Sequence, residues 1–522
     1  MAKICLCLTA KTIAGDLEIL ERNRRYVDIA ELRVDCLDQD ERLLIRRFPE
    51  QAGLPVILTI RRDTDGGNYA QGEASRIRLL AQGLAFAEAD RRKNFAYVDL
   101  EEDLNVPSLE EAARTFGTRI IRSSHNLNGI DEDIPGKIQK LLRTGDEIVK
   151  IAVLARGSAD ALAMVRAARR ERNLDKVFLC MGRYGVFTRI LAEKLGSQIT
   201  YTSAEGEPSA APGQICPKDL VELYRFRSIN ADTRVFGVVG YPLNVTGSPR
   251  FFNTVFSLET AGAVYVPFPA DSLKDFMALA EELDISGVSV TVPYKEAVLE
   301  YLGSMSEDVG QIRACNTITR CPQGWQGTNT DMRGFSDSLL AFAGTVHAGG
   351  GDEAGMVPPP RKSAGRAVSS LKGWKVTVIG AGGAARAAAA ELYRLGARTL
   401  VLNRTLAKAR SLAAPYKFRW GGLDEGGISQ MEKFSDIIVQ TTPAGMEGNP
   451  DRDPLERYSF SGKEIVMDLV YEPERTPFLQ RAAAAGCPVL NGYDMLIRQA
   501  RYQYAQFFKR DFPPTLLNRV NI

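Results

Sequence analysis

The chain has 522 residues and a nearly balanced charge, with 66 basic and 64 acidic side chains and a formal net charge of +2. This length predicts two to four domains, and a composition of 45% hydrophobic and 25% charged residues is typical of globular proteins. The balanced charge indicates no nucleic-acid or membrane-surface partner, and the lack of any apolar run of about 18 residues predicts that no segment spans a membrane.

The first residues, MAKICLCLTAKT, predict a β-strand rather than a secretion signal. Their apolar stretch soon meets Lys11 and Asp16, whereas a signal peptide needs a longer apolar region. The whole chain has eight cysteines without a CxxC pair and only two histidines. We therefore expect reduced thiols, a cytoplasmic location and no metal site.

The first 227 residues contain eight short apolar runs that predict β-strands, and amphipathic stretches such as 74–89 and 159–171 separate most of them. The runs cover residues 3–9, 26–34, 55–61, 95–101, 118–124, 147–154, 176–181 and 198–202. Eight buried strands alternating with helices are typical of a (β/α)₈ barrel, although an open doubly wound sheet fits the same length and alternation. We predict an α/β barrel domain over residues 1–227.

Polar residues lie at or after the carboxyl ends of six of these runs, which is where barrel active sites are built. They are Glu31, Arg33, Asp35, Arg61, Glu101, His125, Arg189 and Gln214. Taken singly, the charged residues also fit surface salt bridges. Their convergence on one face of a barrel favours an active site.

Lys150 lies within EIVKIAVL, an otherwise apolar strand. Burying a lysine is costly unless the amine is paired or used, and burial favours the neutral amine that forms imines. The alternative is a lysine at a strand end whose ammonium reaches solvent. Its position in the sixth run makes Lys150 a candidate imine-forming residue.

Several of these segments resemble type I 3-dehydroquinate dehydratase over residues 3–218. They are ELRVD, TIR, VDLE, SSH, VKIAV, the MGxxGxxxR run that ends at Arg189, and APGQ. The resemblance implies a (β/α)₈ barrel in which Lys150 forms an imine with the substrate ketone and so acidifies the adjacent carbon. His125 would remove the proton from C2 and then help the C1 hydroxyl to leave, while Glu101 would orient and polarise His125.

The same resemblance implies the substrate contacts of the barrel. Arginines would hold the carboxylate and hydroxyls, with Arg189 as the carboxylate fork, and an acid and an amide would bind hydroxyls. The implied set is Arg33, Arg61, Arg189, Glu31 and Gln214, together with Ser209. Here the loop reads SAAPGQ where the family usually has SAPGQ, so Ser209 is displaced by one residue.

A second unit begins near residue 234, where the runs RVFGVVGYP, AVYVPFP, GVSVTVP and NTITR predict strands with helices between them. Hydroxyls, an amide, an ammonium and a carboxylate near these runs suit a small polyhydroxylated ligand beside a proton-transfer pair. They belong to Thr246, Ser248, Ser289, Thr291, Asn316, Lys295 and Asp331. Taken alone, Lys295 fits a solvated lysine at a helix N-terminus. We predict a substrate-binding domain over residues 233–343, closed by the helical region 492–512.

Residues 344–370 are rich in Gly, Pro, Ser and charge and predict a flexible insert. A dinucleotide-binding domain is predicted over residues 371–491, because GAGGAA directly follows the strand KVTVI and precedes an alanine-rich helix. Gly380, Gly382 and Gly383 would allow a tight turn and close approach of a pyrophosphate to the helix N-terminus. An ordinary glycine-rich turn is the alternative.

The end of the next strand indicates which dinucleotide binds. NAD sites usually place Asp or Glu there to bind the ribose diol, whereas this chain has Asn403, Arg404 and Thr405. A guanidinium pairs with a 2′-phosphate, and the amide and hydroxyl add neutral hydrogen bonds. The sequence therefore predicts NADP, with a solvated surface arginine as the alternative reading of Arg404.

From about residue 235 to 508, these motifs together with TTPAGM, DLVYEPERTP and GYDMLIRQA resemble shikimate dehydrogenase. The resemblance implies that Lys295 and Asp331 are the catalytic pair and that Lys295 exchanges a proton with the substrate while hydride moves at the nicotinamide. The implied substrate contacts are Thr246, Ser248, Thr291, Asn316, Tyr471 and Gln499. The implied cofactor contacts are Gly380, Ala381, Gly382, Gly383, Ala384, Asn403, Arg404, Thr405, Thr441, Pro443, Gly492 and Met495.

Together the two halves resemble the bifunctional dehydratase–dehydrogenases of plants and some bacteria. We predict dehydration of 3-dehydroquinate to 3-dehydroshikimate and then reduction to shikimate with NADPH, with small molecules as the only expected partners. One alternative is a quinate-oxidising C-terminal half that uses NAD. Another is a metabolite-sensing regulator without turnover, which we would expect to lack Lys150, His125, Lys295 or Asp331, and all four are present.

Overall fold

The computed structural model describes residues 1–84, 89–243, 247–347, 368–446, 449, 452–517 and 519. The chain forms two compact units. One comprises Met1–Leu243 and Phe252–Ile285, and the other comprises Asn244–Phe251 and Ser286–Ile522. The domain boundaries at 227, 233, 343, 370 and 491 stay predictions.

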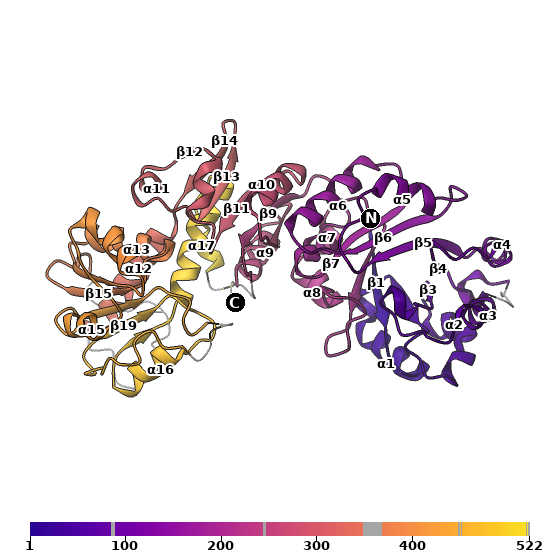
Figure 1. Cartoon of the computed structure of the whole chain (residues 1–522), viewed down its shortest axis with the longest axis horizontal. Helices are drawn as coiled ribbons and strands as arrows, with labels where there is room; N and C mark the ends of the chain where they lie inside the picture. Colours follow the sequence, from indigo (N-terminus) through magenta and orange to yellow (C-terminus); the bar gives the residue numbers. More distant parts are fainter. Residues whose placement is uncertain are drawn as a thin grey trace. The chain divides into compact units, whose positions relative to one another are not determined.

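The first unit contains an eight-stranded parallel sheet that curves into a barrel, which confirms the predicted (β/α)₈ fold (Figure 1, indigo to magenta). The strand order is β7-β6-β5-β4-β3-β2-β1-β8. The strands are β1 (Lys3–Leu8), β2 (Ile29–Arg33), β3 (Val56–Thr59), β4 (Tyr97–Glu101), β5 (Arg119–Asn126), β6 (Ile148–Leu154), β7 (Lys176–Met181) and β8 (Ile199–Ser203). Each lies within a few residues of its predicted run, so the open-sheet alternative is wrong.

The barrel is nearly closed between its two end strands. A single parallel bridge joins Lys176 at the start of β7 to Ser197 just before β8. The backbone N–H of Gln198 also donates to the carbonyl of Lys176 at 2.8 Å. The seam therefore lies beside β7, the strand that precedes Arg189.

Helices follow most of the barrel strands, as the predicted alternation requires. They are α1 (Ile13–Asn23), α2 (Phe48–Ala52), α3 (Glu73–Leu84), α4 (Pro107–Thr115), α5 (Ile134–Leu141), α6 (Ser158–Arg170), α7 (Val186–Ile190) and α8 (Pro217–Glu222). The amphipathic stretch 159–171 corresponds to α6, and 74–89 corresponds to α3, although residues 85–88 lie outside the described part of the chain.

Strand periodicity determines which side chains enter the barrel. Side chains alternate between the two faces of a strand, so Ile148, Lys150 and Ala152 share one face of β6. Ile148 and Ala152 belong to the buried apolar cluster of the barrel interior, together with Ile57 and Val177. Lys150 therefore points into the barrel and is only 5% exposed.

The first unit also contains a parallel strand pair, β9 (Arg234–Gly240) and β10 (Ala263–Pro269), followed by helix α10 (Leu273–Glu282). In the second unit, β13 (Thr317–Cys321) pairs antiparallel with β11 (Ile285–Val290) and with β14 (Gly324–Thr328). Strand β12 (Leu302–Met305) pairs parallel with β14. Helices α9 (Ser248–Leu258), α11 (Glu307–Ile312), α12 (Asp331–His347) and α17 (Tyr493–Phe508) complete these regions.

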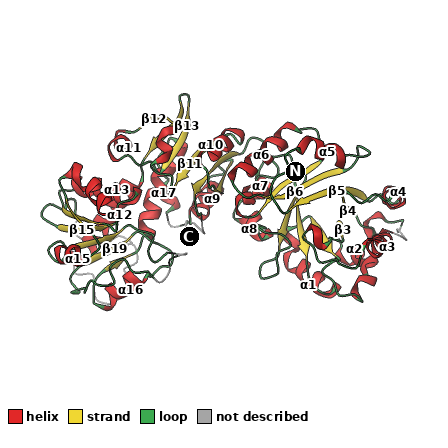
Figure 2. Ribbon diagram, viewed as in Figure 1, coloured by secondary structure: helices red, strands yellow, loops and turns green. Residues whose placement is uncertain are grey.

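A six-stranded parallel sheet forms the rest of the second unit, with the order β17-β16-β15-β18-β19-β20. This is the 3-2-1-4-5-6 order of dinucleotide-binding folds, which confirms the predicted Rossmann domain. Figure 2 labels two strands of this sheet, β15 and β19. The strands are β15 (Lys375–Ile379), β16 (Arg398–Leu402), β17 (Arg419–Gly421), β18 (Ile437–Gln440), β19 (Ile465–Asp468) and β20 (Val489–Leu490). The helices are α13 (Gly383–Arg394), α14 (Leu406–Ala413), α15 (Glu425–Met431) and α16 (Pro477–Ala484).

The start of the predicted insert is helical rather than flexible. Helix α12 continues to His347 because its apolar face continues, with Phe342 and Ala343 buried and Val346 packed against the same core. Most of the remaining insert, residues 348–367, lies outside the described residues. Within the described chain, no helix is both long and apolar enough to cross a membrane.

Candidate active sites

A cavity of about 350 Å³ is lined by residues at the carboxyl ends of the barrel strands. Most of the predicted dehydratase residues line it, from both the strands and the loops that follow them. They are Glu31, Arg33, Arg61, His125, Lys150, Arg189 and Gln214. Glu101 and Ser209 are not among the lining residues.

The Lys150 amine is held inside this cavity by a carboxylate. Its Nζ lies 2.9 Å from Oδ2 of Asp99 on β4 and 4.2 Å from the ring centroid of Tyr201 on β8. Burial alone would raise the pKa of Asp99, but the charges of Arg61 and Lys150 hold that pKa well below its usual range. Asp99 is thus a permanent anion, and it fixes the direction in which the amine points.

His125 lines the same cavity and has an uncommitted ring nitrogen. Nδ1 is buried without a hydrogen-bond partner among the described residues. Burial lowers the pKa of His125 well below its usual value, and the positive charges of Arg61 and Lys150 lower it further. The imidazole is therefore neutral at physiological pH, which is the state in which it can accept a proton.

The prediction that Glu101 orients His125 is corrected by this geometry. Both carboxylate oxygens of Glu101 are taken by arginines, with Arg61 Nη1 at 2.7 Å and Arg76 Nη1 at 2.5 Å. Two buried guanidiniums attract the carboxylate more strongly than a neutral imidazole does. Glu101 therefore positions Arg61 rather than His125.

Of the three predicted substrate arginines, only Arg189 has an open fork. Arg33 forms two hydrogen bonds to Asp35, at 2.9 and 2.7 Å, and Arg61 is held by Asp99 and Glu101. Both terminal nitrogens of Arg189 are buried without a partner, and its Nε donates to the Gly213 carbonyl at 3.1 Å. An unpaired buried guanidinium is costly and is stabilised by a bound anion.

Burial lowers the pKa of Arg189 to about 10, which still leaves the side chain charged at neutral pH. Its two free nitrogens line the cavity that also contains Lys150. Their fork matches the two oxygens of a carboxylate. The Arg189 end of the cavity is therefore suited to an anion.

A small hydrogen-bond network links the other predicted substrate residues. Cys7 donates its thiol to Glu31 at 3.0 Å and accepts from the Gln214 amide at 3.3 Å. Thr59 donates to the second oxygen of Glu31 at 2.9 Å. Ser209 does not line the cavity, and its hydroxyl donates at 3.0 Å to Oε1 of Gln214, which does.

Sequence reasoning missed Asp99, Arg76 and Tyr201. The motif VDLE contains a usable signal for Asp99, because residues two apart on a strand share a face, and Asp99 and Glu101 therefore both face the barrel interior. Arg76 is fully buried on α3 and lacks any motif. Only the folded structure shows that it pairs with Glu101.

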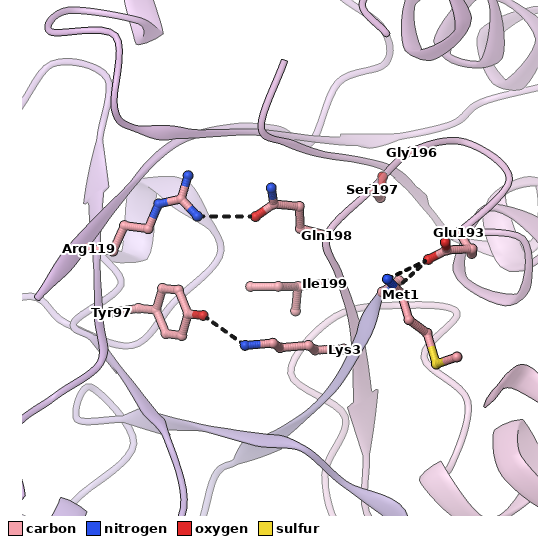
Figure 3. Close-up of a pocket in the computed structure, with 10 residues that line it drawn as sticks. Met1, Lys3, Tyr97, Arg119, Glu193, Gly196, Ser197, Gln198 and Ile199 are labelled. Carbon is pink, nitrogen blue, oxygen red and sulfur yellow. Dashed lines mark hydrogen bonds and ion pairs between the residues drawn. The ribbon is translucent and has the colours of Figure 1, made fainter. Parts of the chain in front are cut away.

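A second hollow of about 340 Å³ lies at the amino ends of the barrel strands, away from the predicted residues (Figure 3). Its polar side chains bond to one another. Lys3 donates to the Tyr97 hydroxyl at 3.3 Å, and Arg119 donates to Gln198 at 3.4 Å. These residues contribute no open polar group of the kind that Arg189 presents.

In the second unit, Lys295 and Asp331 form the predicted pair. Lys295 lies in the loop after β11, and Asp331 is the first residue of α12. Nζ of Lys295 lies 2.5 Å from Oδ2 of Asp331, and their side chains are 15% and 9% exposed. The helix N-terminus stabilises the carboxylate, which in turn fixes the amine.

The other oxygen of Asp331 belongs to a buried amide network. Asn316 donates to Asp331 Oδ1 at 2.8 Å and to the Thr330 hydroxyl at 2.9 Å. The Thr330 hydroxyl donates to Gln499 Oε1 at 3.3 Å, and Asn316 also lies 3.5 Å from that oxygen. The structure therefore brings Lys295, Asp331, Asn316 and Gln499 together, as predicted.

For the other predicted substrate residues, the structure gives a position in the fold. Ser248 is the buried first residue of α9, Thr291 directly follows β11, and Tyr471 is half-buried after β19. Thr246 lies outside the described residues. Sequence reasoning missed Gln503, which accepts from Ser289 at 2.9 Å and donates to the Asn316 carbonyl at 3.2 Å.

The glycine turn lies where the strand order of the Rossmann sheet reverses, between β15 and β18. Gly380 has φ +116°, and a Cβ there would lie 2.4 Å from Oγ1 of Thr441 at the end of β18. Gly382 is the N-cap residue of α13, with no side-chain cap and open space where a Cβ would point. The free N–H groups of α13 therefore face an open space suited to a pyrophosphate.

The same turn approaches the Lys295–Asp331 pair. A Cβ on Gly383, the first residue of α13, would lie 2.9 Å from Cδ of Lys295. Glycine at this position allows the lysine stem to pass beside the phosphate-binding turn. A dinucleotide on this turn would therefore lie close to the pair.

The predicted 2′-phosphate site follows β16. Arg404 and Thr405 are exposed, and the Asn403 amide donates to the Thr405 carbonyl at 2.9 Å. Arg404 makes no ion pair within the described chain. A bound phosphate could therefore take its whole fork.

The remaining predicted cofactor residues also surround the sheet reversal. Ala381 lies within the glycine turn, Ala384 follows it, and Pro443 lies two residues after Thr441. Gly492 is the N-cap residue of α17, and Met495 in its first turn packs in the apolar core of the Rossmann domain at 7% exposure. No group of three or more His, Cys, Asp or Glu side chains in the described residues could hold a metal ion.

Comparison with protein families gives matches along the chain. Residues 4–231 match the model of type I 3-dehydroquinase. Residues 238–318 match the shikimate dehydrogenase substrate binding domain, and residues 362–445 match shikimate / quinate 5-dehydrogenase. The first match covers the barrel, and the third covers the glycine turn.

Two individual proteins match nearly the full chain, and a solved structure matches about half of it. A bifunctional 3-dehydroquinate dehydratase/shikimate dehydrogenase of Arabidopsis thaliana chloroplasts is 30% identical, over 97% of this chain and 81% of its own. The shikimate biosynthesis protein AroDE of Chlamydia pneumoniae is 26% identical, over 97% of this chain and 95% of its own. A Thermus thermophilus shikimate 5-dehydrogenase structure with NADP(H) and shikimate is 29% identical, with a TM-score of 0.45, over 55% of this chain and 98% of its own.

Proposed function

Because the chain belongs to the family of bifunctional 3-dehydroquinate dehydratase/shikimate dehydrogenases, we propose that each half performs one of two consecutive steps. The barrel dehydrates 3-dehydroquinate to 3-dehydroshikimate. The second half reduces 3-dehydroshikimate to shikimate with NADPH. The product of the first step is the substrate of the second, which gives the fusion a chemical rationale.

In the first step, the Lys150 nitrogen adds to the substrate ketone, and the carbinolamine that forms loses water. The lysine ammonium and the ketone thus become a protonated imine and water. The imine withdraws electrons from the adjacent carbon, so neutral His125 can remove the C2 proton. The resulting imidazolium then gives a proton to the departing C1 hydroxyl, which leaves as water. Hydrolysis of the imine releases the product and restores the amine.

Asp99 and Arg189 orient this reaction. Asp99 holds Nζ of Lys150 at 2.9 Å within the cavity, where the substrate ketone must bind. The open fork of Arg189 binds the substrate carboxylate and so sets the position of the ring. Glu31 and Gln214 supply the remaining contacts to hydroxyl groups.

In the second step, Lys295 gives a proton to the C3 oxygen of 3-dehydroshikimate, and Asp331 stabilises and orients the lysine. Asn316 and Gln499 bind hydroxyls of the substrate beside this pair. The residues present also fit the cofactor, because the uncapped N-terminus of α13 suits a pyrophosphate and the open fork of Arg404 suits a 2′-phosphate. When bound, NADPH supplies the hydride.

One observation carries the dehydratase proposal: the amine of Lys150, the neutral imidazole of His125 and the open fork of Arg189 line one cavity. The test is a borohydride trap. The full chain is incubated with 3-dehydroquinate and reduced, and the adduct is located by mass spectrometry. We expect an adduct on Lys150 that Lys150→Ala lacks, and a folded wild-type protein with no adduct would contradict imine chemistry.

A separate assay tests the second activity. NADPH oxidation is followed with 3-dehydroshikimate in wild-type chain, Lys295→Ala and Lys150→Ala. We expect Lys295→Ala to lower kcat by about 100-fold or more, because a proton donor is lost, while Lys150→Ala retains the rate. Equal rates in wild type and Lys295→Ala would contradict the assigned role.

We also propose a cytoplasmic location, supported by eight cysteines that are all free thiols. The proposed domains are the barrel at 1–227, the substrate domain at 233–343 and the Rossmann domain at 371–491. The substrate domain is completed by the α17 region at 492–512.

A further inference from the structure

The helix that carries Arg189 has two functional faces. In α7, residues two positions apart point in nearly opposite directions, so Phe187 and Arg189 face opposite sides. Arg189 points inward and lines the cavity, where two of its nitrogens have no partner. Phe187 is 1% exposed, although it points away from the barrel interior. Something outside the barrel must therefore cover it.

The cover is provided by β10, which lies in the predicted substrate domain of the second enzyme and belongs to the same compact unit as the barrel. The Phe187 ring packs against the Phe268 ring with centroids 5.3 Å apart. Phe268 is itself 1% exposed and packs against Phe276 on α10 at 5.7 Å. An apolar column thus extends from α10 through β10 to α7.

Polar contacts beside this column also join barrel helix α6 to the β10–α10 segment. Gly157 is the N-cap of barrel helix α6 and has no side chain to accept from the helix N–H groups. Asp271, just after β10, accepts instead from the Ser158 backbone N–H at 2.8 Å and from its hydroxyl at 2.7 Å. At the other end of α6, Arg166 pairs with Glu282 at 2.9 Å.

The absence of a side chain at the helix start leaves room for the Asp271 carboxylate. A Cβ on Gly157 would lie 2.8 Å from Oδ2 of Asp271. A carboxylate from β10–α10 therefore replaces the side-chain cap that α6 lacks, and this cap favours the helix N-terminus as an ordinary Asp cap does. The barrel surface of α6 and α7 is adapted to this particular neighbour.

Two hydrogen bonds within the barrel involve Arg189 itself. Its backbone carbonyl accepts from the Thr200 hydroxyl at 3.0 Å, and its Nε donates to the Gly213 carbonyl at 3.1 Å. Helix α7 has only five residues, too few for a stable isolated helix. The packing of Phe187 on Phe268 is thus a main apolar support on the outer face of α7.

We propose that Phe268 is a positioning residue for the dehydratase: it supports α7 from outside and so keeps the Arg189 fork directed into the cavity. This proposal rests on the proposed role of Arg189 in binding the substrate carboxylate. It means that a residue of the dehydrogenase half determines how well the dehydratase half binds its substrate.

The test uses the full chain with Phe268→Ala, Phe268→Leu and the matched control Phe236→Ala. Phe236 is a fully buried phenylalanine on the neighbouring β9, and its ring packs against Phe256 at 5.6 Å. Steady-state dehydratase kinetics give KM and kcat, and the borohydride trap gives the fraction of competent sites. Arg189→Ala is measured in parallel.

We expect Phe268→Ala to raise the KM for 3-dehydroquinate by about 10-fold with kcat per competent site within about 2-fold, because binding geometry is disturbed and the lysine and histidine are not. Phe268→Leu should show a smaller rise in KM, and Phe236→Ala none. If Phe268→Ala does not fold, Phe268→Leu decides. An unchanged KM in the decisive variant, or an equal rise in Phe236→Ala, overturns the proposal.

Arg189→Ala separates this proposal from the function on which it rests. A raised KM in Arg189→Ala with an unchanged KM in the decisive Phe268 variant overturns only the positioning role. An unchanged KM in Arg189→Ala overturns the carboxylate-binding role and the positioning role with it. Loss of competent sites at unchanged KM in the Phe268 variants would indicate a purely structural residue and also overturns the proposal.

Discussion

Lys150 on β6 and Asp99 on β4 meet inside the barrel, with the amine 2.9 Å from a carboxylate oxygen, and both side chains are nearly inaccessible to solvent. Asp99 also accepts from Arg61 at 2.8 Å and from the Ser123 hydroxyl at 2.5 Å. The carboxylate is therefore held rigidly, and it holds the amine in turn.

The first prediction concerns this pair. Asp99→Asn preserves the shape of the side chain but removes the charge that orients the amine and compensates Arg61. We expect the dehydratase kcat to fall by about 100-fold, since small displacements of a reacting group cost about that much. The rate of adduct formation in the borohydride trap should fall in parallel.

Shikimate dehydrogenase activity in the same Asp99→Asn chain serves as the internal control, because Lys295 and Asp331 lie in the other unit. Retained dehydrogenase activity with a dehydratase rate near that of wild type would contradict an orienting role for Asp99.

The second prediction concerns the pH dependence of the dehydratase. Burial and two neighbouring cations lower the pKa of His125 well below its usual value of 6.5. A base with a lowered pKa stays neutral, and hence competent, as the pH falls through 6.5. We expect kcat/KM for 3-dehydroquinate to fall on the acidic side of its pH profile only well below pH 6.5.

The histidine signals in NMR spectra provide a direct check, because the chain has only two histidines and His125→Gln assigns the relevant one. Titration of the His125 ring at or above pH 6.5 in the free enzyme would contradict the neutral-base assignment.

The third prediction concerns the choice of cofactor. Arg404→Ala removes the open guanidinium after β16, and hydrogen bonds to charged groups contribute about 1.5–3 kcal/mol. We expect the KM for NADPH to rise by roughly 10- to 100-fold, while the KM for NADH changes little because NADH lacks the 2′-phosphate. Arg398→Ala is the matched control, since Arg398 is an exposed arginine at the other end of the same strand. Equal effects on NADPH and NADH would show that Arg404 does not read the phosphate.

Sequence patterns predicted most of the elements that surround these residues. Eight apolar runs matched the barrel strands because buried parallel strands leave a strong local signal, and the apolar run around Lys150 made it a candidate for burial. The glycine turn and Asn403–Thr405 fell at strand ends for the same reason. What the sequence did not predict was the pairing of the charged groups inside the barrel.

The motif VDLE supplies two inward carboxylates, and local sequence does not show which cation each one meets. That depends on the stagger of neighbouring strands and on helix α3, which brings Arg76 to Glu101. Arg76 and Arg61 both pair with Glu101, and Lys150 pairs with Asp99. The predicted Glu101–His125 contact was wrong because a buried arginine without any motif competes for the carboxylate.

The last prediction concerns stability and pH. Asp16 on α1 is fully buried; its Oδ1 accepts from the Ala10 N–H at 2.9 Å, and its Oδ2 has no partner among the described residues. Burial raises the pKa of Asp16 from 3.8 to about 7. An acid with a raised folded-state pKa favours the folded state fully below its unfolded pKa, and this contribution is lost as the pH rises toward the folded value. The protein should therefore lose stability between about pH 4 and pH 7 through this group.

Asp16→Asn keeps the acceptor for Ala10 but does not ionise. We expect the free energy of unfolding of Asp16→Asn, minus that of wild type, to be larger at pH 8 than at pH 4 by about 4 kcal/mol, since the pKa shift is about 3 units and each unit corresponds to about 1.4 kcal/mol. Urea unfolding of the barrel at the two pH values measures this difference. Asp40→Asn, at an exposed carboxylate nearby, should show no such pH-dependent gain. A pH-independent difference between Asp16→Asn and wild type would mean that Asp16 is ionised at neutral pH and is compensated by a donor outside the described residues.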